Sequence, residues 1–143
     1  MIYYELKIES STEEIVVNEK NVITFAEVVF ETDDKNTKTK SNAILAQMTV
    51  RGIIVQGQDT SINEQAIKLS EWARDLKNST TYRNVTLTLR DDEDESIVRI
   101  YKIPAMFVCD YKETFSTTDN NAFTFELKLN QSTNKLNDIK IYQ

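Results

Sequence analysis

Residues 91–95 (DDEDE) form the densest group of potential metal ligands in this sequence. Ca²⁺ takes roughly six to eight oxygen ligands, so such a run could contribute to a calcium site. The EF-hand pattern, however, needs a glycine and a final glutamate at fixed positions, and neither is present. We therefore interpret the run as the solvated tip of a hairpin between strands at residues 85–90 and 97–103.

Histidine is absent from the chain, and Cys109 is its single cysteine. Without an imidazole there is no histidine base to activate a serine or cysteine nucleophile, and no histidine ligand for zinc. The two glycines, Gly52 and Gly57, are too few for a phosphate-binding loop. We therefore predict that the protein is not an enzyme and holds no cofactor or metal, and that Cys109 is a small buried apolar side chain.

Asp110 is the one acidic residue inside an apolar strand, between Cys109 and Tyr111. A buried carboxylate at this position could have a raised pKa and act in acid–base catalysis. Strand alternation instead predicts that Asp110 faces solvent, with Met106 and Val108 as apolar exceptions on the same face. We favour the solvent-facing position.

Aromatic side chains could stack on bases or sugars, but here they are dispersed along the predicted strands without an interleaved basic set. They are Trp72 and six tyrosines, Tyr3, Tyr4, Tyr82, Tyr101, Tyr111 and Tyr142. We expect the tyrosines to pack in the core and on the sheet faces, and Trp72 to anchor the core.

The longest polar stretch, residues 31–42 (ETDDKNTKTKSN), lacks the period of a strand or helix. Its basic tract could order on a partner, for example on an acidic surface such as residues 91–95 of a neighbouring copy. The alternative is an ordinary mobile loop, although so long a polar loop is unusual in a compact β domain without a use. We predict a subunit interface at Asp33, Asp34, Lys35, Asn36, Thr37, Lys38, Thr39 and Lys40.

Length and composition indicate one soluble domain, residues 1–143, with 40% hydrophobic and 28% charged residues. The net charge of −6 disfavours direct, sequence-specific nucleic-acid binding, because a phosphate backbone selects for a basic face. Residues 1–9 alternate between polar and apolar types and lack the uninterrupted run of a signal peptide or membrane span. We expect a cytoplasmic protein without membrane insertion.

Alternation of polar and apolar residues dominates the chain and predicts about eight strands. Residues 22–30 are apolar on both faces, which suits a central or doubly covered strand. Gly52 is placed where a bend or bulge would help, and Asn and Asp replace glycine at turns such as residues 119–121. The expected strands are residues 2–8, 22–30, 44–56, 85–90, 97–103, 106–111, 123–129 and 139–141.

One segment has a helical period instead. Ser61 and Glu64 have the spacing of a capping box, in which each side chain reaches the other's free backbone N–H. Apolar residues then recur at steps of three and four, at Ile62, Ala66, Leu69, Ala73 and Leu76. The chain is therefore predicted to be mainly β, a barrel or sandwich of largely antiparallel strands with one amphipathic helix at about residues 61–77 that covers the sheet.

Several segments between residues 22 and 131 follow one another in an order that resembles the tail-tube superfamily. They are the long polar loop 31–42, the strand end 50–54 (VRGII), the single helix, residues 107–116 (FVCDYKETFS) and residues 123–131 (FTFELKLNQ). This superfamily comprises the haemolysin-coregulated tube protein of type VI secretion, phage tail-tube proteins and the tube proteins of contractile injection particles.

The resemblance implies a structural subunit that forms rings, commonly of six, which stack into a tube with a hydrophilic lumen. It implies that loop 31–42 contacts a neighbouring subunit or ring and that polar residues of the long strands line the lumen. The implied partners are further copies of the chain, sheath, baseplate and spike components, and cargo that passes through the lumen. Assembly would take place in the cytoplasm, with delivery or release as part of an extracellular particle.

The alternative function is a monomeric β-sandwich module that binds carbohydrate or protein. Such a module would place several aromatic side chains on one exposed face, for example Tyr3, Tyr101, Tyr111 and Tyr142. A tube subunit would instead carry polar interface loops.

Overall fold

A computed structural model describes residues 1–32, 44–55, 57, 60–76, 79–117, 121–132 and 138–143 of the chain. The elements are β1 (Ile2–Glu9), β2 (Glu14–Val17), β3 (Ile23–Thr32), β4 (Ile44–Val55), α1 (Thr60–Ala73), β5 (Arg83–Asp91), β6 (Ile97–Phe115), β7 (Ala122–Gln131) and β8 (Lys140–Tyr142). The strands pair antiparallel in the order β2-β1-β5-β6-β7-β4-β3, with β8 added to β6. The predicted mainly β fold with one helix is confirmed, and among the described residues the sheet stays open, with β2 and β3 at its ends.

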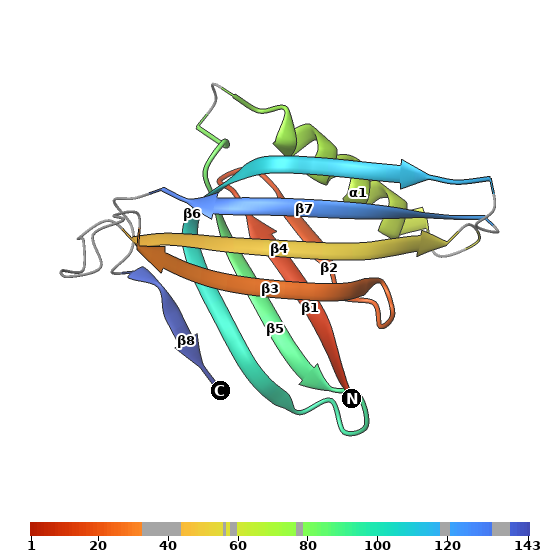
Figure 1. Cartoon of the computed structure of the whole chain (residues 1–143), viewed down its shortest axis with the longest axis horizontal. Helices are drawn as coiled ribbons and strands as arrows, with labels where there is room; N and C mark the ends of the chain where they lie inside the picture. The colour runs from red at the N-terminus through yellow and green to blue at the C-terminus, as the bar shows by residue number, and fades with distance from the viewer. Residues whose placement is uncertain (33–43, 56, 58–59, 77–78, 118–120, 133–137) are drawn as a thin grey trace.

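Strand β6 belongs to two half-sheets. Its residues 97–106 pair with β5, and its residues 106–115 pair with β7. The four-stranded half-sheet consists of residues 107–115 of β6 with β7, β4 and β3, and the N-terminal half-sheet consists of β2, β1, β5, residues 97–106 of β6, and β8. Figure 1 shows the two as layers whose strands cross, joined through the bend in β6.

The bend in β6 lies at Pro104 and Ala105, where the sequence predicted two separate strands. Ala105 has a positive φ of 56°, and the register between β5 and β6 shifts at this point. The backbone groups freed by the bulge find other partners: Asn84 Oδ1 accepts from the Ala105 N–H at 3.3 Å, and Gln131 Nε2 donates to the Pro104 carbonyl at 2.9 Å. The strand therefore continues through the proline, because a bulge is one of the few places where a strand tolerates it.

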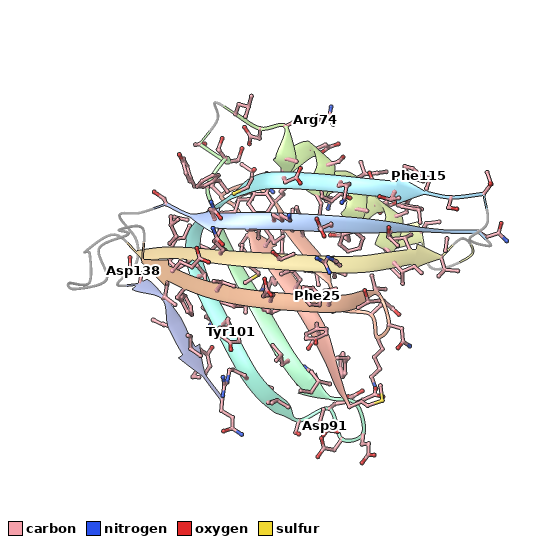
Figure 2. The ribbon with its side chains drawn as sticks, in the orientation of Figure 1. Phe25, Arg74, Asp91, Tyr101, Phe115 and Asp138 are labelled. Atoms are coloured by element: carbon pink, nitrogen blue, oxygen red, sulfur yellow. The ribbon has the colours of Figure 1, made fainter. Side chains whose placement is uncertain are left out.

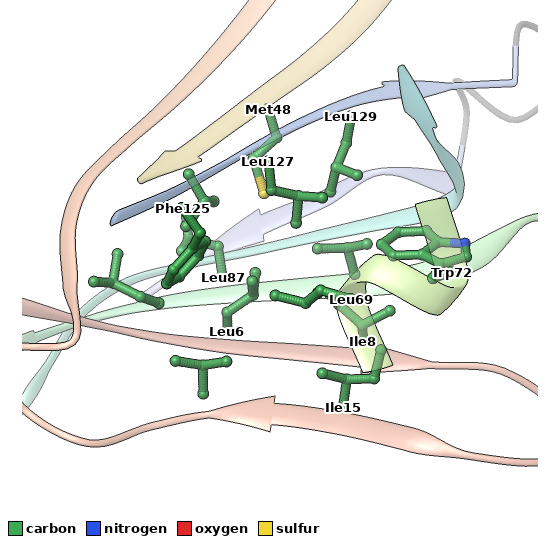
Figure 3. Close-up of a cluster of buried hydrophobic side chains, with 14 of the residues drawn as sticks. Leu6, Ile8, Ile15, Met48, Leu69, Trp72, Leu87, Phe125, Leu127 and Leu129 are labelled. Carbon is green, nitrogen blue, oxygen red and sulfur yellow. The ribbon is translucent and has the colours of Figure 1, made fainter. Parts of the chain in front are cut away.

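The core lies between the two half-sheets (Figure 3). Within each strand polar and apolar residues alternate, and the apolar ones line the core. The predicted inward faces are confirmed: the strand at 123–129 buries Phe125, Leu127 and Leu129, and β5 buries Val85 and Leu87. The largest fully buried side chains also include Leu6, Ile8, Ile15, Met48, Leu69, Trp72, Ile103 and Met106. Burial of a large apolar side chain contributes about 1.5–3 kcal/mol, so this contact holds the layers together.

Helix α1 contacts both β6 and β2, and so bridges the two half-sheets at one side of the core. Tyr111 of β6 donates its hydroxyl to the Ala66 carbonyl at 3.4 Å, and Gln65 Oε1 accepts the Val16 N–H at 2.9 Å. Trp72 is buried, as predicted. The helix ends at Ala73, earlier than predicted, and Leu76 is therefore 80% exposed instead of lying on the buried face.

Two strands differ from the sequence prediction. Because both of its faces are apolar, strand β3 was expected to be either central in a sheet or covered on both faces; among the described residues it pairs with β4 alone, so it is not central but an edge strand. Strand β2 was not predicted, because four residues are too few to show a period; its pairing with β1 and the Gln65 hydrogen bond hold it in place. The described part of the chain has eight strands, the predicted number, because two predicted strands merge into β6 while β2 is added.

Asparagine takes the place of glycine at turns, as predicted. Asn21 and Asn121 have positive φ angles of 70° and 59°, and Glu95 and Ala105 are the other non-glycine residues with positive φ among the described residues. Gly52 lies opposite a bulge at Thr24 of β3, which confirms the predicted irregularity.

Candidate functional site

The predicted interface residues Asp33 to Lys40 lie outside the described residues. Their role as a contact to a neighbouring subunit therefore remains a prediction. Residues 119–120 of the predicted turn also lie outside the described residues.

The acidic run forms the tip of the β5–β6 hairpin, as predicted (Figure 2). The Asp91 N–H donates to the Ser96 carbonyl at 2.9 Å and closes the turn. Lys20 Nζ lies 3.4 Å from Asp92 Oδ1 and 3.6 Å from Glu95 Oε1, so the run is partly neutralised by a lysine. Among the described residues, no group of three or more acidic, histidine or cysteine side chains is placed to hold a metal ion.

Cys109 is exposed, so the prediction of a buried side chain is wrong. The cause is a bulge: Val108 pairs with Leu129 and Asp110 with Lys128, which leaves Cys109 as the extra residue. This insertion changes the phase of the strand, so that Met106 and Val108 face inward before it and Asp110 faces solvent after it. The solvent-facing position of Asp110 is thereby confirmed, and the two apolar exceptions are explained.

The tyrosines do not share one open surface. Tyr111 points into the core, where its ring stacks on Phe125 with centroids 6.5 Å apart. Tyr101 also packs against the core, whereas Tyr3 lies on the other face of its sheet with Lys20 Nζ 5.0 Å from its ring centroid. The arrangement expected of an aromatic binding module is therefore not found for these residues.

Arg83 and Gln131 are the buried polar or charged side chains of the described residues. No carboxylate is buried among them, so the described part of the chain holds no pair of buried carboxylates for acid–base chemistry.

Arg83 is only 5% exposed and was not singled out from the sequence. Its Nη1 lies 2.9 Å from Glu13 Oε1, its Nε donates to the Thr80 carbonyl at 2.9 Å, and its guanidinium lies 5.3 Å from the Trp72 ring centroid. We call these four residues the Arg83 cluster. Its ion-pair partner, Glu13, lies 70 residues away in the sequence, so the pair leaves no local signal. The contacts of Arg83 are those of a structural anchor beneath α1.

The middle of the outer face of the four-stranded half-sheet carries charged and polar side chains, and apolar residues such as Val29, Ile53 and Phe107 lie in the rows on either side. One row across the strands consists of Phe25, Arg51, Glu126 and Lys112, and it carries two positive charges and one negative. The face turned toward the core is mainly apolar, with Glu113 and Gln131 as polar exceptions, so the half-sheet has one largely dry side and one solvated side.

The next row on this face has the opposite balance. It consists of Glu27, Thr49, Lys128 and Asp110, and it carries two negative charges and one positive. These two adjacent rows therefore carry opposite net charges.

Glu126 is the centre of an ion cluster on this face. Its Oε2 lies 2.5 Å from Arg51 Nε, and its Oε1 lies 3.8 Å from Lys112 Nζ and 3.7 Å from Lys128 Nζ. The hydrogen bond from Arg51 and the charges of the two lysines lower the pKa of Glu126. We call these four residues the Glu126 cluster; it keeps a carboxylate ionised among three exposed cations.

Both edges of the four-stranded half-sheet are open among the described residues. Strand β3 has β4 on one side only, and residues 107–115 of β6 have β7 on one side only. Open strand edges present unpaired N–H and C=O groups, which can pair with a strand of another chain. The sequence missed this feature because an edge is defined by the absence of a neighbour.

No protein-family model matches the sequence, and no curated protein matches it significantly. Solved structures do share its fold. Hcp1 from Flavobacterium johnsoniae superposes with a TM-score of 0.59 at 11% identity, over 90% of this chain and 89% of that one. A chain of the anti-feeding prophage cap, which terminates the AFP tube, gives a TM-score of 0.55 at 11% identity over 96% and 87% of the two chains.

A chain of the sheath–tube complex of PVC, an extracellular contractile injection system, gives a TM-score of 0.54 at 13% identity, over 98% of this chain and 88% of that one. The chain therefore has the tail-tube fold that the order of its sequence segments predicted. The described part of the chain contains no helix that is both long and apolar enough to cross a membrane.

Proposed function

We propose that this chain is a structural subunit of the inner tube of a phage-tail-like contractile injection or type VI-like secretion apparatus, acting as a single domain without catalysis. The observation that carries the proposal is the four-stranded half-sheet with a polar outer face and two open edges. The structural likeness to Hcp1 and to chains of AFP and PVC particles supports it.

The two open edges suit a ring. The strand directions alternate through β6, β7, β4 and β3, so β3 runs antiparallel to β6. An even number of strands lets β3 of one copy lie antiparallel to β6 of the next, and the alternation continues around the ring. Closure of such a ring removes every open edge of this half-sheet.

The dimensions suit a tube. Neighbouring strands lie about 4.8 Å apart, so each copy adds about 19 Å of circumference. Six copies, the number that the resemblance implies, give about 115 Å and a backbone-to-backbone diameter of about 37 Å. The polar outer face would line the lumen, because the other face is covered by the core.

Contacts outside the ring follow from the same arrangement. Helix α1 and the N-terminal half-sheet lie on the side away from the polar face, where sheath components would bind. Residues 33–40 would contact a neighbouring subunit or ring, and baseplate and spike components would contact the ends of the tube. We propose cytoplasmic assembly and release within an extracellular particle, with cargo passing along the lumen.

The purified full-length chain tests the proposal by size-exclusion chromatography with light scattering and by negative-stain microscopy. Rings or stacked rings with a central hole are the expected result. A strict monomer at high concentration, both alone and with its neighbouring sheath and baseplate components, would contradict the tube role.

A further inference from the structure

We infer that two copies join through β3 of one and residues 107–115 of β6 of the other, in a register that places Glu27 opposite Lys112. This inference rests on the proposed ring and adds the residue contacts that hold it. It concerns the open edges of the four-stranded half-sheet, both of which carry exposed charged side chains on the polar face.

The lengths of the two edges favour this register. In an antiparallel pair with Glu27 opposite Lys112, residues 24–32 of β3 lie along the whole of residues 107–115 of β6. The residues between the bulges at Thr24 and Cys109 then form an uninterrupted ladder, from Phe25 opposite Thr114 to Val29 opposite Asp110. Shifted registers leave part of one edge without a partner.

The charges of the facing side chains favour this register over the unstaggered one, in which the rows of one copy continue directly into the next. If the rows of one copy simply continued into the next, Glu27 would lie opposite Asp110, and two carboxylates would face each other. A stagger of two residues keeps the same faces together and replaces this repulsion with a Glu27–Lys112 pair. A stagger is also what a closed sheet requires, because strands tilt when a sheet closes into a barrel.

The core side of the edges fits as well. In the inferred register Val28 lies opposite Tyr111, and both already pack against the core. Phe30, which is 45% exposed although it points to the core side, lies beside Cys109 at the bulge. Joining the edges would therefore cover an exposed phenylalanine as well as the open backbone groups.

Disulfide trapping tests the register directly. The full-length Cys109→Ser chain is prepared with Glu27→Cys and Lys112→Cys, oxidised mildly and run on a non-reducing gel. Opposite residues in an antiparallel pair have Cα atoms about 4.5–5.5 Å apart, which a disulfide can span. The expected result is a ladder of multimers that disappears on reduction and ends at the closed ring. The matched control, Glu27→Cys with Asp110→Cys, reports the unstaggered register and should give at least tenfold less multimer.

Charge reversal gives a second readout in chains without added cysteines. Glu27→Lys should weaken ring assembly at least tenfold, because it would face Lys112, and Lys112→Glu in the same chain should restore it. In the unstaggered register Glu27→Lys would instead face Asp110 and strengthen assembly. Unchanged unfolding curves for the variants would show that each still folds.

The outcomes separate the inference from the function that it rests on. Rings of the unaltered chain without the 27–112 ladder, or with Glu27→Lys assembling better, overturn the register and leave the tube role standing. If the unaltered chain forms no rings and neither cysteine pair forms a ladder, both the register and the proposed function are overturned.

Discussion

The Arg83 cluster and the Glu126 cluster use the same chemistry, a guanidinium against a carboxylate, in different surroundings. Arg83 is 5% exposed and also binds a backbone carbonyl and an aromatic ring, whereas the Arg51 side chain in the Glu126 cluster is 52% exposed. The difference lies in the arginines, because replacing a buried side chain removes its packing and hydrogen bonds, while an exposed cation contributes little to folding. We infer that the Arg83 cluster stabilises the fold and that the Glu126 cluster gives the outer face its surface charge.

The largest effect is expected when Arg83 is replaced. Arg83→Ala should lower the free energy of unfolding by about 3 kcal/mol, because it removes a buried side chain that packs on Trp72 and donates to the Thr80 carbonyl. Arg51→Ala, the matched change in the exposed cluster, should cost less than about 1 kcal/mol. Urea unfolding of both variants measures the difference. Equal losses would show that burial does not distinguish the two clusters.

A second substitution tests whether the stability of the four-stranded half-sheet depends more on the packing of its inner face than on the charges of its outer face. Gly52 lies on its inner face, and an added Cβ would meet the Phe125 ring and lie 2.7 Å from the Val22 carbonyl oxygen. Gly52→Ala should therefore cost about 2 kcal/mol, more than any single charge on the opposite face. Thermal unfolding beside Arg51→Ala gives the comparison, and an alanine variant as stable as the parent would mean that the Phe125 ring moves aside freely.

The smallest effect is a pH dependence of opposite sign at two glutamates of this half-sheet. The pKa of Glu126 is lowered by Arg51 and the lysines, so its stabilising contribution is present above its ordinary pKa near 4.5 and lost as the pH falls through the lowered value. The pKa of Glu113, on the inner face, is raised by burial, so its charge is destabilising above the raised value and this cost is relieved as the pH falls.

Glutamine variants separate the two glutamates. At neutral pH Glu126→Gln should lower stability by under about 1 kcal/mol, and Glu113→Gln should raise it slightly. Both differences should shrink as the pH falls, first for Glu113 as the pH passes through its raised pKa and then for Glu126 as the pH passes through its lowered pKa. Unfolding free energies at several pH values check this, and shifts of the same sign in both variants would contradict the assignment.

The sequence predicted much of the fold because the facing of a side chain is a local property. The alternation of Phe125, Leu127 and Leu129 with Glu126 and Lys128 fixes which residues are buried on any strand that contains them. The position of Cys109 could not be predicted, because one extra residue in a pair of strands changes the phase of all that follow.

The polar face and its open edges could not be predicted from the sequence, for a different reason. The residues of the Glu126 cluster come from β4, β6 and β7, which meet only when the strand order is known. The residues predicted for the interface, 33–40, were chosen for their composition, whereas the open edges that we infer to join copies depend on which strands lack a neighbour. The order of the segments along the chain did predict the tail-tube fold, because this order is shared with the similar structures even though only 11–13% of the residues are identical.

By itself, the sequence determined the buried and solvated faces of the strands where no bulge intervenes, the amphipathic helix and the absence of histidine chemistry, since these depend on residue type and local spacing. Only the tertiary structure decided that β6 bends at Pro104 to join two half-sheets, that Arg83 is buried beneath α1, and that β3 is an edge. Each of these depends on contacts between residues distant in the chain, and strand pairing is selected by the sum of those contacts across the whole core.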